Sequence, residues 1–174
     1  MNSFAVRPSA PCPCGTQLPW WGGCSIGGET RRRNKLPVCI HFVWATKNRL
    51  PLIGVDIERD LYRCIRGICT NMKCECLAVG GMEDHVHLMV ALNSTLSLGR
   101  VMKQVKGGSS RMVSERLGPT EWFAWQPNYA AFAVSTTNRA RVVRYIEGQK
   151  QHHAGGTLWP EAEATDEEAV DDDP

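Results

Sequence analysis

The segment CLAVGGMEDHVHLMVAL, residues 76–92, is the stretch that decides the fold. Its two apolar halves are rich in residues that favour strands, and the short turn Met82-Glu83-Asp84 separates them. We therefore predict a β-hairpin. Because side chains alternate between the two faces of a strand, His85 and His87 share one face and Val86 points to the other.

Periodicity predicts further elements on both sides of this hairpin. The expected strands cover residues 38–46, 76–81, 85–92 and 122–135, and the expected helices begin at residue 56, at Thr95 or Ser97, and after Ser135–Asn138, the last running to about His153. Both Thr95 and Ser97 are good helix caps. Gly107-Gly108 in the middle of the second helix suggests a kink or a close backbone approach.

The resulting order, β-α-β-β-α-β-α, predicts an α+β fold. Its first six elements match the ferredoxin-like βαββαβ arrangement, an antiparallel sheet with two helices on one face. The additional C-terminal helix must then dock elsewhere, and we expect it across the other face of the sheet. This fold hosts many functions, so the function has to be argued from the site.

Composition and charge divide the chain into three parts. Residues 1–36 are a Pro/Gly/Cys/Arg-rich stretch predicted to be a disordered extension, residues 37–154 form the folded domain, and residues 155–174 form an acidic tail predicted to be disordered. The tail holds eight acids and no basic residue, so residues 1–160 carry 20 basic against 10 acidic residues. This balance favours a polyanionic partner such as nucleic acid, although a solvated basic surface has the same composition.

Several classes of protein are disfavoured by what the sequence lacks. No apolar run approaches the roughly 20 residues of a membrane span, and the first residues lack the pattern of a signal peptide. We therefore predict a cytoplasmic protein with no membrane partner, whose eight cysteines are mostly reduced. Cys12, Cys14 and Cys24 lack the second closely spaced pair that a zinc site would need.

The last helix carries a second group of chemically active side chains. Tyr145 and Gln149 are four residues apart, and Arg141 lies a further four back, so a continuous helix aligns all three. Each motif also has a non-functional interpretation. A His-x-His pair can occur by chance. Without the histidines, Tyr145 would be read as an aromatic residue at the edge of the core and Gln149 as an ordinary solvated residue. Together the residues offer metal ligands, a nucleophile and a phosphate contact.

These motifs resemble the single-tyrosine HUH transposases of the smallest bacterial insertion sequences, a family that includes the REP-associated tyrosine transposases. The resemblance spans about residues 37–154. Its two main motifs are His85-Val86-His87 and Tyr145-Ile146-Glu147-Gly148-Gln149. Further agreement lies in His41-Phe42-Val43-Trp44-Ala45-Thr46-Lys47, in Lys106-Gly107-Gly108-Ser109-Ser110-Arg111 and in Gln149-Lys150-Gln151-His152-His153.

The resemblance implies DNA transposition by metal-dependent cleavage and strand transfer of single-stranded or hairpin DNA. It implies Mg²⁺ or Mn²⁺ bound by His85, His87 and Gln149, with Tyr145 attacking the DNA to form a 5′-phosphotyrosine intermediate. Family members usually act as homodimers in which one subunit's helix serves its partner's histidines, so cis and trans assembly both remain open. The expected phosphate contacts are Arg100, Lys103, Lys106, Arg111 and Arg141.

Other assignments also remain open. Lys106 is a candidate for helping to deprotonate Tyr145, and Trp122, Phe123 and Trp125 either stack on bases or belong to the core. Two alternative functions are a domesticated REP-associated enzyme with the same chemistry and a non-catalytic single-stranded nucleic-acid-binding module. Replication initiators commonly use a third histidine, relaxases place the tyrosine ahead of the pair, and a two-histidine phosphoesterase would need a second His-x-Ser/Thr motif.

Overall fold

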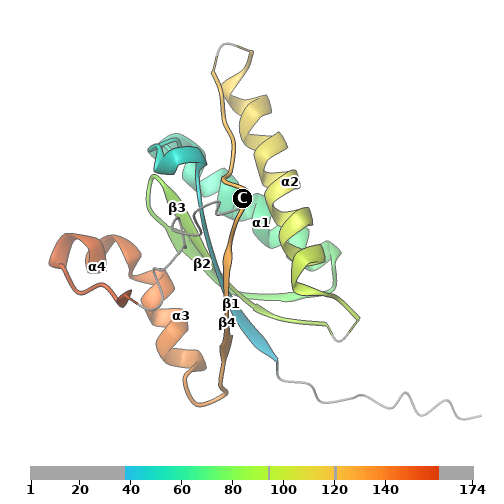
Figure 1. Cartoon of the computed structure of the whole chain (residues 1–174), viewed down its shortest axis with the longest axis vertical. Helices are drawn as coiled ribbons and strands as arrows, with labels where there is room; N and C mark the ends of the chain where they lie inside the picture. The colour runs from blue at the N-terminus through green and yellow to red at the C-terminus, as the bar shows by residue number, and fades with distance from the viewer. Residues whose placement is uncertain (1–37, 94, 120, 161–174) are drawn as a thin grey trace, which may run out of the picture. The chain divides into compact units, whose positions relative to one another are not determined.

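The computed structural model describes residues 38–93, 95–119 and 121–160 (Figure 1). The elements are β1 Cys39–Ala45, the 3-10 helix η1 Lys47–Arg49, α1 Val55–Asn71, β2 Glu75–Gly81, β3 His85–Ala91, α2 Leu98–Leu117, β4 Ala130–Val134, α3 Arg139–Glu147 and α4 Gln149–Gly155. The extension predicted over residues 1–36 lies outside the described residues, as does most of the predicted tail. Within the described ranges, no helix has the length and apolar character needed to span a bilayer.

Four antiparallel strands form one sheet in the order β2-β3-β1-β4. The hairpin β2-β3 is the predicted one, and β1 lies between β3 and β4. In this register Val43 and Gly80 flank His87 on its two sides. The strand order and the helix positions confirm the predicted ferredoxin-like α+β fold.

Helices α1 and α2 cover one face of the sheet, and α3 and α4 lie on the other (Figure 1). The α1–α2 face is apolar because alternate residues of β1 and β3 point toward it. The core on this side includes Ile40, Phe42, Trp44, Val86, Leu88, Val90, Ile57, Leu61, Ile65, Val101, Met102 and Val105. Burial of each large apolar side chain stabilises the fold by roughly 1.5–3 kcal/mol.

Helix α2 decides two points left open by the sequence. Its cap is Ser97, whose side chain accepts a hydrogen bond from the Arg100 N–H. The helix is continuous through Gly107-Gly108, so there is no break, and Gly108 marks a close approach to α1 instead. A Cβ at Gly108 would lie 2.7 Å from Cδ1 of Ile68.

The opposite face of the sheet receives α3, as expected for the additional helix. Val142 and Ile146 of α3 pack against Cys39, Ala78 and Met89 of the sheet. The contact is unusually close at Gly80 of β2, where a Cβ would lie 2.2 Å from the Ile146 carbonyl oxygen. The lack of a side chain at Gly80 therefore lets the α3 backbone rest directly on β2.

The prediction of one uninterrupted last helix is wrong. The helix divides at Gly148, whose φ of −94° and ψ of 11° depart from helical values. A Cβ at this position would lie 3.1 Å from the Arg144 carbonyl oxygen and 3.2 Å from Nε2 of His152. As a result Tyr145 belongs to α3 while Gln149 is the first residue of α4, and the two do not lie along one straight helix.

Candidate active site

The histidine pair on β3 faces α3 and is completely enclosed. The side chains of His85 and His87 are 1% and 0% exposed, and their ring centroids are 5.0 Å apart. Strand alternation places Val86 between them in the core on the other face. The pair thus lies where α3 and α4 cover the sheet.

Asp84 orients the His85 ring. Its Oδ1 lies 2.6 Å from Nδ1 of His85, and its Oδ2 lies 3.2 Å from Nε of Arg49. Partial burial raises the pKa of Asp84, but the hydrogen bond from His85 and the charge of Arg49 outweigh it and hold the pKa below its usual range. Because a carboxylate only accepts, Nδ1 of His85 donates, and Nε2 is left as the ring atom with a lone pair.

His41 of β1 orients the second histidine. Its Nε2 lies 3.0 Å from Nδ1 of His87, and the two rings are stacked with centroids 5.2 Å apart. When Nδ1 of His87 donates to His41, the lone pair of His87 is on Nε2. Sequence reasoning did not single out His41 as part of the site, because its contact with His87 depends on the pairing of β1 with β3.

Tyr145 reaches the same face from α3 of the same chain. It is 6% exposed, and its ring lies perpendicular to that of His87 with centroids 6.1 Å apart. The backbone N–H of Trp159 donates to the phenolic oxygen over 3.2 Å, and the His152 ring lies 4.9 Å from the Tyr145 ring. One chain therefore brings the tyrosine and the histidine pair together without a second subunit.

Gln149 lies at the α3–α4 junction and is 1% exposed. The next turn of α4 places the ring of His153 5.1 Å from that of His85, so α4 extends beside the histidine pair. Within the part of the chain that the structure describes, no three His, Cys, Asp or Glu side chains are arranged to hold a metal. A metal site here would need a third ligand other than His, Cys, Asp or Glu. The amide oxygen of Gln149 is a ligand of that type.

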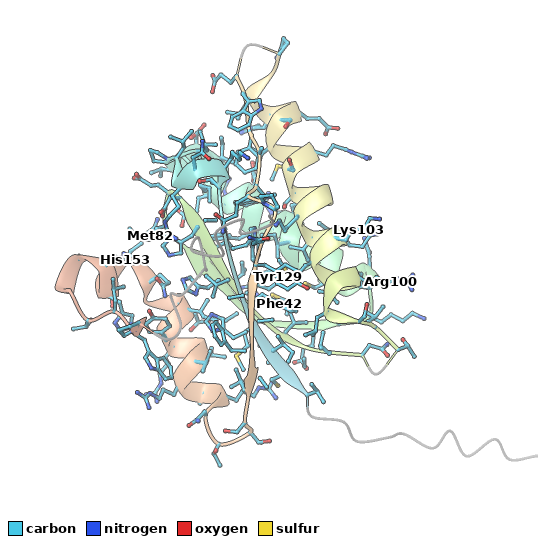
Figure 2. All side chains as sticks on the ribbon, in the orientation of Figure 1. Phe42, Met82, Arg100, Lys103, Tyr129 and His153 are labelled. Atoms are coloured by element: carbon cyan, nitrogen blue, oxygen red, sulfur yellow. The ribbon has the colours of Figure 1, made fainter. Side chains whose placement is uncertain are left out.

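The predicted phosphate contacts divide between two surfaces. Arg141 of α3 lines a cavity of about 450 Å³ that also borders Tyr145, and Arg144, which was not among the predicted contacts, lines it too. Arg100, Lys103 and Arg111 are exposed on α2, on the other side of the sheet, and Figure 2 shows Arg100 and Lys103 pointing outward. These three residues therefore lie across the sheet from Tyr145.

Lys106 does not lie beside Tyr145, and its ammonium group is held by backbone carbonyl oxygens instead. Its Nζ donates to the carbonyl oxygens of Gln126, Pro127 and Asn128 at 2.5, 2.8 and 3.1 Å. Burial lowers its pKa to about 8. Because α2 lies across the sheet from α3, the hypothesis that Lys106 deprotonates Tyr145 is wrong, while its contact with DNA remains a prediction.

The three aromatic residues before β4 do not share one role. Phe123 and Trp125 are buried in the α1–α2 core, and the Trp125 indole N–H donates to the Ser109 hydroxyl over 3.0 Å. Trp122, by contrast, is 58% exposed. The structure therefore leaves base stacking open for Trp122 alone among the three.

Comparison with known proteins identifies the family. Residues 35–149 match the family described as "Transposase IS200 like". The chain belongs to the IS200-like transposase family. Transposases of this family are enzymes that cleave and join DNA.

Individual relatives agree with this assignment. Over 114 residues this IS200-like transposase is 28% identical to the ISDra2 transposase TnpA of Deinococcus radiodurans, covering 63% of this chain and 81% of the relative. A crystal structure from D. radiodurans R1, provisionally assigned as a transposase, has a TM-score of 0.53 at 29% identity and covers 67% of this chain and 95% of that one.

A second solved structure shares the fold. It is a REP-associated tyrosine transposase bound to a REP hairpin, with a TM-score of 0.52 at 18% identity. The match covers 76% of this IS200-like transposase and 80% of that chain.

Proposed function

We propose that this transposase cleaves and rejoins single-stranded DNA with Tyr145 as the nucleophile, through a 5′-phosphotyrosine intermediate. The observation that carries the proposal is the meeting of Tyr145 with His85 and His87 in one enclosed site, with ring centroids of Tyr145 and His87 6.1 Å apart. The guanidinium groups of Arg141 and Arg144 border the same tyrosine and suit a phosphate.

In the proposed step the phenolic oxygen of Tyr145 bonds to phosphorus, and the bond from phosphorus to the 3′ oxygen of the preceding nucleotide breaks. The phenol loses its proton, and the released 3′ oxygen gains one. Because the ordinary pKa of tyrosine is about 10, the phenol needs assistance near neutral pH. The hydrogen bond from the Trp159 N–H favours the ionised oxygen and so assists.

The proposed reaction is reversible because the phosphotyrosine keeps the energy of the broken phosphodiester bond. The 3′-hydroxyl of a second strand can attack the same phosphorus, and Tyr145 then leaves with a proton. Strands are joined in this way without ATP. A covalent tyrosine therefore suits strand transfer better than an activated water would.

The donor set of the site also supports a divalent cation, Mg²⁺ or Mn²⁺, held by His85, His87 and Gln149. Two buried imidazoles and an amide oxygen suit such an ion, with the imidazoles favouring manganese. When bound, the cation would polarise a non-bridging phosphate oxygen. The protein itself orients the two imidazole rings through hydrogen bonds, from His85 to Asp84 and between His87 and His41.

The test of the nucleophile is the variant Tyr145→Phe. It should form no covalent complex with single-stranded oligonucleotides on a denaturing gel, while its affinity for them stays close to that of the wild type. Tyr129→Phe is the matched control, because Tyr129 packs edge-on against Phe42, which belongs to the core on the other face, and should react normally. Labelled DNA migrating with Tyr145→Phe would refute the assignment.

The test of the ligands compares two glutamines of α4. Gln149→Ala and His87→Ala should raise the concentration of Mn²⁺ or Mg²⁺ needed for half-maximal cleavage and weaken Mn²⁺ binding in calorimetry. Gln151→Ala, an exposed position on the same helix, should change neither quantity. Unchanged metal dependence in Gln149→Ala would remove it from the proposed ligand set.

The DNA substrate and the assembly complete the proposal. The exposed basic residues of α2 would contact phosphates of a hairpin or of a second stretch of the strand, away from Tyr145. A homodimer stays a prediction from the family resemblance. A domesticated enzyme would have the same site, and DNA flanking the gene, with or without element ends, distinguishes the two roles.

A further inference from the structure

A second cavity lies beside the proposed nucleophile. It is an open cavity of about 210 Å³, bordered by β1, β4, the start of α3 and Trp159. His41 and Phe132 form part of its wall, with ring centroids 6.0 Å apart, and Val142 contributes an apolar surface. Ser135 and Asn138 add polar side chains to the same wall. The lining is thus largely aromatic and apolar, with a few polar groups.

Trp159 separates this cavity from the basic cavity that contains Tyr145. It lines both cavities. Its backbone N–H donates to the Tyr145 oxygen, its ring lies edge-on to the Tyr145 ring at 5.7 Å, and the Arg141 guanidinium lies 4.4 Å from its centroid. A strand whose phosphate meets Tyr145 and Arg141 therefore has this smaller cavity immediately beside it.

The chemistry of the smaller cavity matches a planar ring with a polar edge. Aromatic side chains stack on the faces of any nucleobase. Asn138 precedes α3 but makes no side-chain capping hydrogen bond to it, so its amide can offer a donor and an acceptor together. An asparagine amide pairs in that way with the edge of a base.

We propose that this cavity binds one nucleobase of the single-stranded DNA next to the phosphate that Tyr145 attacks, with Asn138 reading its edge. The inference rests on the proposed function and adds a sequence-reading element to it. Phe132 and Trp159 bound the base, while Arg141 and Arg144 hold the phosphate on the other side of Trp159. The base at this position then contributes to the choice of cleavage position.

The test uses the full chain and oligonucleotides with one abasic nucleotide at each position around the mapped cleavage position. For the wild type, an abasic nucleotide at one flanking position should slow covalent attachment and weaken binding by about tenfold. Asn138→Ala should lose several-fold on the intact oligonucleotide and respond much less to that abasic nucleotide. Asn138→Asp replaces a donor by an acceptor, so it should change which base is preferred at that position.

Asn71→Ala is the matched control, because Asn71 is an exposed residue at the end of α1 and should behave as the wild type. If no flanking abasic nucleotide changes attachment or affinity, or if Asn138→Ala and Asn138→Asp keep the wild-type response, the base cavity is refuted. A base-dependent affinity without any covalent complex would instead refute the proposed chemistry and support the cavity. The two failures are therefore distinguishable.

Discussion

Gly80 is the residue whose substitution tests most directly how the fold builds the site. An ideal Cβ there lies 2.2 Å from the Ile146 carbonyl oxygen, and an ordinary contact needs at least 3.4 Å. The contacted atom belongs to the backbone of α3, so the rotation of a side chain cannot relieve the overlap. In Gly80→Ala, α3 must therefore move away from β2 by roughly 1 Å.

That displacement sets the expected magnitude. Tyr145 precedes Ile146 in the chain, so the phenol moves with the helix away from the histidine pair. A misplacement of about 1 Å in a reacting group costs on the order of 100-fold in rate. The overpacking itself should lower the free energy of unfolding by about 1–3 kcal/mol.

The assay is single-turnover covalent attachment to a labelled oligonucleotide, with urea unfolding of the same preparations. Gly108→Ala is the control for stability, since its Cβ meets the flexible end of Ile68 at 2.7 Å on the other side of the sheet. Its rate should stay within about threefold of the wild type. Gly107→Ala, with nothing within 4 Å, should gain about 0.5–1 kcal/mol from helix propensity.

The reasoning would be refuted by a folded Gly80→Ala protein that attaches to DNA at the wild-type rate. In that case the close packing of α3 against β2 does not determine the position of Tyr145. A loss of rate in Gly108→Ala equal to that in Gly80→Ala would also contradict it, because stability alone would then explain both.

Four further predictions concern individual residues. Mixing Tyr145→Phe with His87→Ala should restore no covalent attachment, because each intact site needs both residues in one chain; restored attachment would show assembly across two subunits. Lys106→Met should lower the free energy of unfolding by roughly 1–3 kcal/mol through its lost carbonyl bonds, measured in urea. Lys103→Gln should leave the free energy of unfolding unchanged and reduce the slope of log affinity against log salt by about 0.7–0.9. Asp84 stabilises the fold above its ordinary pKa of about 3.9, and this contribution disappears as the pH falls through the lower pKa of the folded state. Thermal melts from pH 7 to pH 3 should therefore show a smaller acid loss for Asp84→Asn, and parallel curves would contradict this.

Features that depend on one segment could be predicted because they follow from backbone geometry. The two-residue period of a strand places His85 and His87 on one face whatever surrounds them. The helical period predicted α1 and α2 and allowed Ser97 as a cap. The break at Gly148 was missed because helical spacing continues through it, and the departure of its φ and ψ from helical values is visible only in the structure.

The sequence by itself determined the order of the elements, the class of fold, the shared face of the two histidines and the basic character of the domain. Only the tertiary structure decided that His41 lies against His87, that α3 rests on Gly80, and that Lys106 is on the opposite side of the sheet from Tyr145. Contacts of this second kind join segments far apart in the chain. They depend on strand register and on which faces bury together, and the residue spacing within one segment does not specify which residues of another segment it meets.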